Sequence, residues 1–143
     1  MKRNKTTKMT AVLLCAAMLL MALVSGCGGG APSDVESAKE ALLGTWYNRY
    51  ENDEGEEEWS NAEYTFYENG TMCEKDNQET WYTWDLLSSE ESGKYTLMTE
   101  KKRDYGPSKK AVDEIQFDGS EHFSVTSGYS EALYGTEYYK NKG

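Results

Sequence analysis

Aromatic and aliphatic residues recur at every second position along most of the chain after Gly44. Such a period of two is typical of β-strands with one buried face, because successive side chains point to opposite sides of a strand. The clearest runs centre on Tyr64 and Phe66; on Tyr82, Trp84 and Leu86; on Tyr95 and Leu97; on Ile115 and Phe117; and on Phe123 and Val125. We predict strands over 45–51, 58–68, 71–75, 79–87, 94–100, 110–117, 121–127 and 134–140.

Turn-forming residues separate these runs, which indicates that neighbouring strands are joined by tight connections. They are Asn52-Asp53-Glu54-Gly55, Asn69-Gly70, Asp76-Asn77, Ser92-Gly93, Gly106-Pro107 and Asp118-Gly119. Asn-Gly and Asp-Gly pairs suit two-residue hairpins, because both central residues need a positive φ. We therefore expect two-residue hairpins at Asn69-Gly70 and Asp118-Gly119.

The pattern predicts an all-β fold: a small antiparallel meander barrel of about eight strands. Closing the meander removes exposed strand edges that would otherwise aggregate. A sandwich of two sheets is the main alternative. One short helix is expected before the strands, because apolar residues recur at helical spacing within residues 34–43, with Asp34 or Ser37 as the cap and Gly44 as the end.

The first residues predict a secretory signal. Lys2, Arg3, Lys5 and Lys8 are followed by 14 residues, 11–24, with no polar side chain apart from the thiol of Cys15. A basic head before a short apolar run is typical of such signals. Spanning a bilayer takes about 20 apolar residues, so the run is short for a permanent helix. The alternative, a buried core helix, is disfavoured because the run is not amphipathic.

The end of the apolar run, Val24-Ser25-Gly26-Cys27, resembles the bacterial lipobox. The resemblance implies that Cys27 is lipidated and that the chain is cut before it. We thus expect a lipoprotein signal peptide at 1–26, a flexible tether at 27–36 and the barrel domain at 37–143. Glycines 28–30 and the small residues after them suit a tether. The expected location is the extracytoplasmic face of a bacterial cell membrane, held by lipid.

Charge narrows the choice of partners. All 25 acidic residues follow Ser33, whereas four of the 15 Lys and Arg lie in the head, so residues 27–143 carry a net charge near −14. This balance argues against nucleic acid and against an anionic lipid surface as partners. It favours either simple solubility or a cationic partner.

Metal and cofactor sites are not predicted. After cleavage and lipidation, Cys73 is the one remaining free thiol, and His122 is the one histidine. These residues cannot make a cysteine cluster or an intrachain disulfide. The acidic run 51–58 has the wrong spacing for an EF-hand loop and suits a solvated hairpin tip. Cys73 is expected to be a small buried residue.

Three short motifs, Gly44-Thr45-Trp46, Phe66-Tyr67-Glu68-Asn69-Gly70-Thr71 and Gly135-Thr136-Glu137-Tyr138-Tyr139-Lys140, resemble small bacterial lipocalin-like (calycin-type) lipoprotein domains. The resemblance covers about residues 40–140. It implies that Gly44 and Trp46 form the barrel signature, with Trp46 at the closed end. Lipocalins place an Arg from the last strand over that Trp, and here the last strand offers Lys140. The domain is also shorter than an ordinary lipocalin.

Abundant rings supply the candidate ligand-binding residues. Tyr64, Phe66, Tyr82 and Trp84 are expected inside the barrel, where an eight-stranded barrel holds one small ligand or fills with side chains. Rings of the opposite parity, Tyr47, Tyr67 and Trp81, are expected to face outward. Outward rings suit sugar stacking or a protein contact, or they are ordinary cross-strand pairs.

Catalysis is not expected. His122 alternates with Phe123 and should point away from the core, with Asp113 and Glu121 as potential partners. No Gly-x-Ser-x-Gly nucleophile motif is present. The leading hypothesis is therefore a lipid-anchored extracytoplasmic binding module for a small amphipathic ligand. The alternative is an interaction or structural protein, such as an inhibitor or envelope assembly factor, with a filled barrel and no ligand.

Overall fold

The computed structural model describes residues 29–143 except 76–78, 92, 102–105, 129–131 and 134. The predicted signal peptide, Cys27, the turn at Asp76-Asn77 and Ser92 lie outside the described residues. The elements are α2 (Val35–Leu42), β1 (Gly44–Glu51), β2 (Glu57–Phe66), β3 (Thr71–Lys75), β4 (Thr80–Ser88), β5 (Lys94–Lys101), β6 (Lys109–Phe117), β7 (His122–Ser127) and β8 (Glu137–Tyr139).

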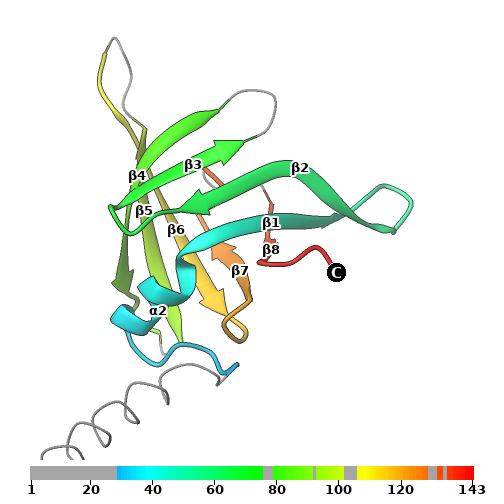
Figure 1. Cartoon of the computed structure of the whole chain (residues 1–143), viewed down its shortest axis with the longest axis horizontal. Helices are drawn as coiled ribbons and strands as arrows, with labels where there is room; N and C mark the ends of the chain where they lie inside the picture. The colour runs from blue at the N-terminus through cyan, green and yellow to red at the C-terminus, as the bar shows by residue number, and fades with distance from the viewer. Residues whose placement is uncertain (1–28, 76–78, 92, 102–105, 129–131, 134) are drawn as a thin grey trace, which may run out of the picture.

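The strands form one closed barrel in which each strand pairs antiparallel with the next and β8 pairs with β1 (Figure 1). The predicted all-β fold with eight strands and one short helix is confirmed, and the sandwich is excluded. Every predicted strand coincides with an observed one to within three residues at each end. The agreement follows from the strength of the period-two pattern, which sets both the extent of a strand and its buried face.

The helix α2 closes one end of the barrel. Asp34 caps it by accepting from the backbone N–H of Ser37 at 2.8 Å, and the Ser37 hydroxyl accepts from the N–H of Asp34 at 3.2 Å. Its apolar face buries Ala38 and Leu42 against the barrel. Gly44 follows with a φ of +108°, a left-handed conformation that allows the chain to leave the helix and enter β1 directly.

Aromatic rings in mutual contact occupy much of the interior formed by the described residues. Trp46, Tyr64, Phe123 and Tyr138 have no exposed surface. Their neighbours are arranged mainly edge to face, the geometry that aromatic pairs prefer. The pairs are Trp46–Phe123 at 4.7 Å between centroids, Trp46–Phe117 at 6.4 Å, Tyr64–Tyr138 at 5.5 Å, Phe66–Trp84 at 5.5 Å and the stacked pair Phe123–Tyr138 at 4.8 Å.

Two hairpin turns are one residue longer than predicted. The N–H of Tyr67 donates to the carbonyl of Thr71, and that of Asp118 to the carbonyl of His122, so three residues rather than two lie between each closing pair. In the first turn the N–H of Gly70 also donates to the carbonyl of Tyr67, and Gly70 has a φ of +75°. This combination of a four-residue turn with one left-handed glycine is a common three-residue hairpin loop.

The connection from β7 to β8 contributes to the core. Its described residues Ala132 and Leu133 are 2% and 1% exposed and belong to the apolar cluster. Gly135, with a φ of +102°, lies so close to Asn48 that an added Cβ would be 2.3 Å from Nδ2 of that side chain. Asn48 sits at an irregularity in the β1–β2 pairing and donates from Nδ2 to the carbonyl of Glu137 at 3.0 Å, which joins β1 to β8.

The described part of the predicted tether contacts the barrel. The Tyr95 hydroxyl donates to the carbonyl of Pro32 at 2.9 Å. The carbonyl oxygen of Gly29 lies 3.2 Å from the position of a Cβ added to Gly119, in the turn between β6 and β7. The segment before α2 therefore runs along the helix-covered end of the barrel.

Candidate functional site

The signature residues meet at the end covered by α2. The Trp46 indole N–H donates to the carbonyl of Leu42, the last residue of α2, at 2.7 Å. Its ring contacts those of Phe117 and Phe123, which also contact each other at 5.8 Å between centroids. Gly44 supplies the turn that brings the helix end over this ring. The hydrogen bond ties the helix to the first strand in a place where an unpaired indole N–H would be costly.

Lys140 lies over the Trp46 ring, with its Nζ 5.2 Å from the ring centroid. Burial lowers the pKa of Lys140, and Glu121 opposes that shift. A partly desolvated ammonium gains most from the negative face of an aromatic ring. Lys140 thus supplies a positive charge at the position where the resemblance implies an arginine.

The predicted ligand-binding residues line the interior at different levels. Tyr64 and Phe66 are 0% and 2% exposed, and both are engaged by other rings. Trp84 is half-buried, and its indole N–H donates to the carbonyls of Thr71 at 2.9 Å and Tyr67 at 3.3 Å, which places it against the β2–β3 turn. Tyr82 is 8% exposed. Ligand binding by these four residues stays a prediction.

Several polar groups lie inside the barrel, where the apolar alternation does not predict them. Glu74 and Asp113 are 6% and 0% exposed, and the Tyr82 hydroxyl donates to Oε2 of Glu74 at 3.3 Å. Burial strongly raises the pKa of Tyr138, and Tyr64, Asp113 and Glu74 add to the shift. The hydroxyl of Thr99, itself 3% exposed, is buried and has no hydrogen-bond partner among the described residues.

A signal for these residues is present in the sequence. Asp113 has the parity of Ile115 and Phe117, Thr99 that of Tyr95 and Leu97, and Glu74 that of Met72. Reading polar as well as apolar residues by parity would have placed all three inside.

His122 faces outward as predicted, but both expected partners are wrong. Asp113 lies inside the barrel, because it shares the parity of Ile115 rather than that of the outer face. His122 instead contacts Glu137, with 2.6 Å between Nε2 and Oε2, and Asp118, with 3.7 Å between Nδ1 and Oδ2. The reason is the β7–β8 register, in which His122 faces Tyr139 and stacks on its ring at 4.3 Å.

Glu137 also lines a groove of about 240 Å³ on the outer surface, which we call the β1–β8 groove. Its lining residues are Arg49, Tyr50, Glu51, Glu57, Thr136, Glu137 and Tyr139. Arg49 pairs with Glu57 and lies 5.6 Å from the Trp59 ring and 6.0 Å from the Tyr139 ring. Two of the charged groups in this groove, Arg49 and Glu57, therefore pair with each other, and the Tyr139 ring lies between Arg49 and the stacked His122 ring.

A second groove, of about 190 Å³, crosses the outer face of β4, β5 and β6, and we call it the β4–β6 groove. The strand register gives its construction. The row Asp85–Met98–Val112 forms one wall and the row Thr83–Glu100–Lys110 the other, while the chain at Trp84, Thr99 and Ala111 forms the floor. Met98 and Val112 are 40% and 56% exposed, so one wall is apolar and open to solvent.

Two of the three rings expected on the outside are well exposed. Tyr67 and Trp81 are 37% and 51% exposed and stack at 5.9 Å between centroids. Tyr47 is half-buried, with Nζ of Lys142 4.7 Å from its ring. Cys73, which pairs with Trp81 across β3 and β4, is buried as predicted, and burial raises the pKa of its thiol.

Among the described residues, no group of three or more His, Cys, Asp or Glu side chains is placed to hold a metal ion. Within the same part of the chain, no helix is both long and apolar enough to span a membrane. Comparison with protein-family models, curated proteins and solved structures found no match. The fold itself defines the chain as a small eight-stranded antiparallel β-barrel protein.

Proposed function

We propose that this protein is a lipid-anchored extracytoplasmic interaction module that binds its partner through the outer surface of a filled barrel. The supporting observation is the packing of the interior. Trp46, Tyr64, Leu97 and Tyr138 have no accessible surface, and a side chain beside a water-sized space would have some. A barrel whose interior is occupied by side chains would leave its outer face as the surface for recognition.

The lipid anchor rests on Val24-Ser25-Gly26-Cys27 and on the basic, apolar segment before it. Expression of the full chain in a bacterium fed an alkyne-tagged fatty acid tests it. The wild type should carry the label and sediment with membranes, and Cys27→Ala should lose the label. Cys15→Ala is the matched control and should keep it. An unlabelled wild type would contradict the anchor.

A second candidate function is binding of a small amphipathic ligand at the polar side of the interior. The observation that favours it is the Thr99 hydroxyl, which has no partner in the part of the chain that the structure describes and lies in a barrel interior that also contains Glu74, Tyr82 and Asp113. A hydrogen-bonding ligand would satisfy that hydroxyl. Native mass spectrometry of the full chain, released from detergent, tests this function. A retained small molecule that Thr99→Val loses supports it, and repeated absence of any adduct contradicts it.

A further inference from the structure

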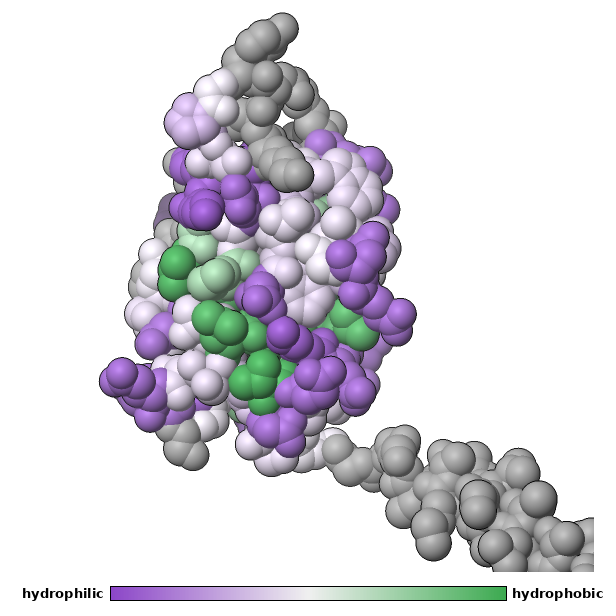
Figure 2. All heavy atoms as spheres, turned by 90° about the vertical axis from the view of Figure 1, so that its left-hand side faces the viewer, coloured by the Kyte–Doolittle hydropathy of each residue, from purple (hydrophilic) through white to green (hydrophobic). Residues whose placement is uncertain are grey.

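The outer face of β4, β5 and β6 carries an exposed apolar patch, formed by Leu87, Met98 and Val112. These side chains are 44%, 40% and 56% exposed. Met98 and Val112 are cross-strand partners, and Leu87 lies one row away, opposite Thr96. Figure 2 shows hydrophobic side chains gathered on this side of the molecule, with hydrophilic ones around them. A contiguous exposed apolar patch with a polar border is typical of an interaction site.

The rim of the patch is mainly acidic. Asp85 and Glu100 border it in the β4–β6 groove, and Glu114 borders it on the side of Leu87, opposite Thr96 in the strand register. Lys110 is the cation of the groove; its side chain is 76% exposed and its Nζ lies 4.0 Å from Glu100. Lys39 also reaches this surface, with its Nζ 2.7 Å from Oδ1 of Asp85. Three carboxylates against two ammonium groups still leave this surface negative, like the domain as a whole.

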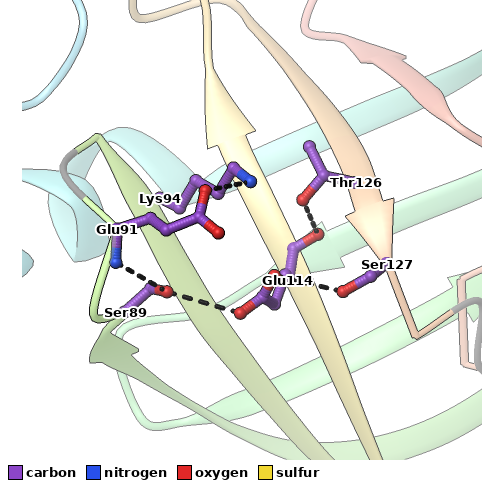
Figure 3. A network of polar contacts seen from close by, with 6 residues as sticks. All are labelled: Ser89, Glu91, Lys94, Glu114, Thr126 and Ser127. Atoms are coloured by element: carbon purple, nitrogen blue, oxygen red, sulfur yellow. Dashed lines mark hydrogen bonds and ion pairs between the residues drawn. The ribbon is translucent and has the colours of Figure 1, made fainter.

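Hydroxyl groups fix the acidic rim at Glu114 (Figure 3). Ser89 donates to its Oε1 at 3.3 Å and Ser127 to its Oε2 at 3.1 Å, while the Thr126 hydroxyl donates to its backbone carbonyl at 3.3 Å. Lys94 lies beside this group, where its Nζ contacts Glu91 at 2.5 Å. Hydrogen bonds from hydroxyls orient the Glu114 carboxylate without cancelling its charge.

We propose that the β4–β6 groove and its apolar patch dock a protein segment whose apolar side chains are flanked by Lys or Arg. The apolar residues of that segment would cover Met98 and Val112, and its cations would face Glu100 and Glu114. This inference rests on the proposed function, for which it names the surface and the chemistry of the partner. An apolar centre with a polar rim is the usual anatomy of a protein interface.

The fold and the charge favour this occupant over two others. The strands close into a barrel, so the described part of the chain presents no free strand edge to which a partner strand could add. A second copy would bring together two domains of the same strong negative charge, with acidic rims facing each other. A basic segment gains from the same field that repels a second copy.

The test uses the full chain in phosphatidylcholine nanodiscs and three fluorescein-labelled ten-residue peptides, with the signal from empty nanodiscs subtracted. One peptide alternates Leu with Lys, the second Leu with Glu, and the third Ser with Lys. Fluorescence anisotropy should detect saturable binding of the Leu–Lys peptide only. Equal binding of the Ser–Lys peptide would show general attraction to an acidic protein and would overturn the proposal.

Two charge-matched variants locate the site. Val112→Lys places a cation in the patch, and Gln116→Lys places the same charge on the same face of β6, four residues or about 13 Å away. Val112→Lys should weaken binding of the Leu–Lys peptide at least about tenfold more than Gln116→Lys. Equal weakening would overturn the proposal. Both positions are exposed, so both variants should fold, which circular dichroism checks.

Two further outcomes separate this proposal from a dimer interface and from the lipid anchor. The sedimentation coefficient of the wild type could rise with protein concentration while that of Val112→Lys stays constant. That result would assign the patch to a second copy and overturn the proposal. Absence of fatty-acid label on Cys27 with intact peptide binding would refute the anchor and leave the docking surface standing. The two failures are therefore distinguishable.

Discussion

The two faces of β4, β5 and β6 carry similar apolar side chains with opposite fates. Leu86, Leu97 and Ile115 point inward and have no exposed surface, whereas Leu87, Met98 and Val112 point outward and are 40% to 56% exposed. Leu86 and Leu87, and Leu97 and Met98, are neighbours in sequence. Hydrophobicity alone therefore does not locate the core, because the parity of a residue in its strand decides whether it stabilises the fold.

The largest expected effect contrasts Leu97→Ala with Met98→Ala. The first should lower the free energy of unfolding by about 3 kcal/mol, because it leaves a cavity among buried side chains. The second should change it by less than about 0.5 kcal/mol, as is usual for exposed positions. Urea denaturation followed by tryptophan fluorescence measures both. Equal losses would mean that the outer patch is structural and would break the contrast.

A smaller effect, of opposite sign, is expected on the inner face. Thr99→Val should raise the free energy of unfolding by about 1 kcal/mol, because a methyl group of similar size replaces a buried hydroxyl that no described residue satisfies. Thr96→Val, on the outer face of the same strand, is the control and should have no such effect. Destabilisation by Thr99→Val would show that an unseen water or ligand satisfies the hydroxyl.

Asp85, on the outer face of β4, should give a modest pH-dependent effect. The pKa of Asp85 is lowered chiefly by the hydrogen bond from Lys39, whose Nζ lies 2.7 Å away. Since the folded pKa lies below the unfolded value near 3.8, this stabilisation is present above that pH and is lost as pH falls through the folded pKa.

Both side chains of this pair are partly exposed, so solvent screening limits the effect. Asp85→Asn should cost no more than about 0.5 kcal/mol at pH 7 and nothing near pH 2. Urea titrations at a series of pH values measure the difference, with Asp53→Asn in the first hairpin turn as the control. A loss that grows on acidification would contradict the assigned direction.

Leu87→Ser should have the smallest effect on folding. The side chain is 44% exposed, so the free energy of unfolding should stay within about 0.5 kcal/mol of wild type. Binding of the Leu–Lys peptide should still fall severalfold, because the apolar patch becomes smaller. Thermal melting and the anisotropy assay measure the two quantities. A large drop in melting temperature with unchanged peptide binding would reverse the proposed division between the faces.

The sequence predicted the strands and their buried sides well because both depend on local alternation. Tyr64 and Phe66 lie inside and Tyr67 and Trp81 outside, as the pattern of two required. The contacts between side chains of neighbouring strands were harder to predict from the sequence. The partners of His122 depend on the β7–β8 register. That register cannot be derived from the length of the segment that connects the two strands.

The two surface grooves could not be predicted for a related reason. The β4–β6 groove exists because Met98 faces both Asp85 and Val112, and Glu100 faces both Thr83 and Lys110, across three strands. These pairings follow from the exact length of two hairpin loops. The alternation did not mark Met98 and Val112 as a surface feature, since single exposed apolar residues are common. Only their adjacency distinguishes them.

The contact of Gly29 with the β6–β7 turn limits how far the barrel can lie from a lipid anchor on Cys27. One residue separates Cys27 from Gly29, and two steps of extended chain reach about 7 Å. A lipid on Cys27 would thus hold the helix-covered base of the barrel against the headgroups. The opposite end of the barrel would then lie away from the bilayer, and the outer face of β4, β5 and β6 would face sideways, toward other proteins of the same membrane.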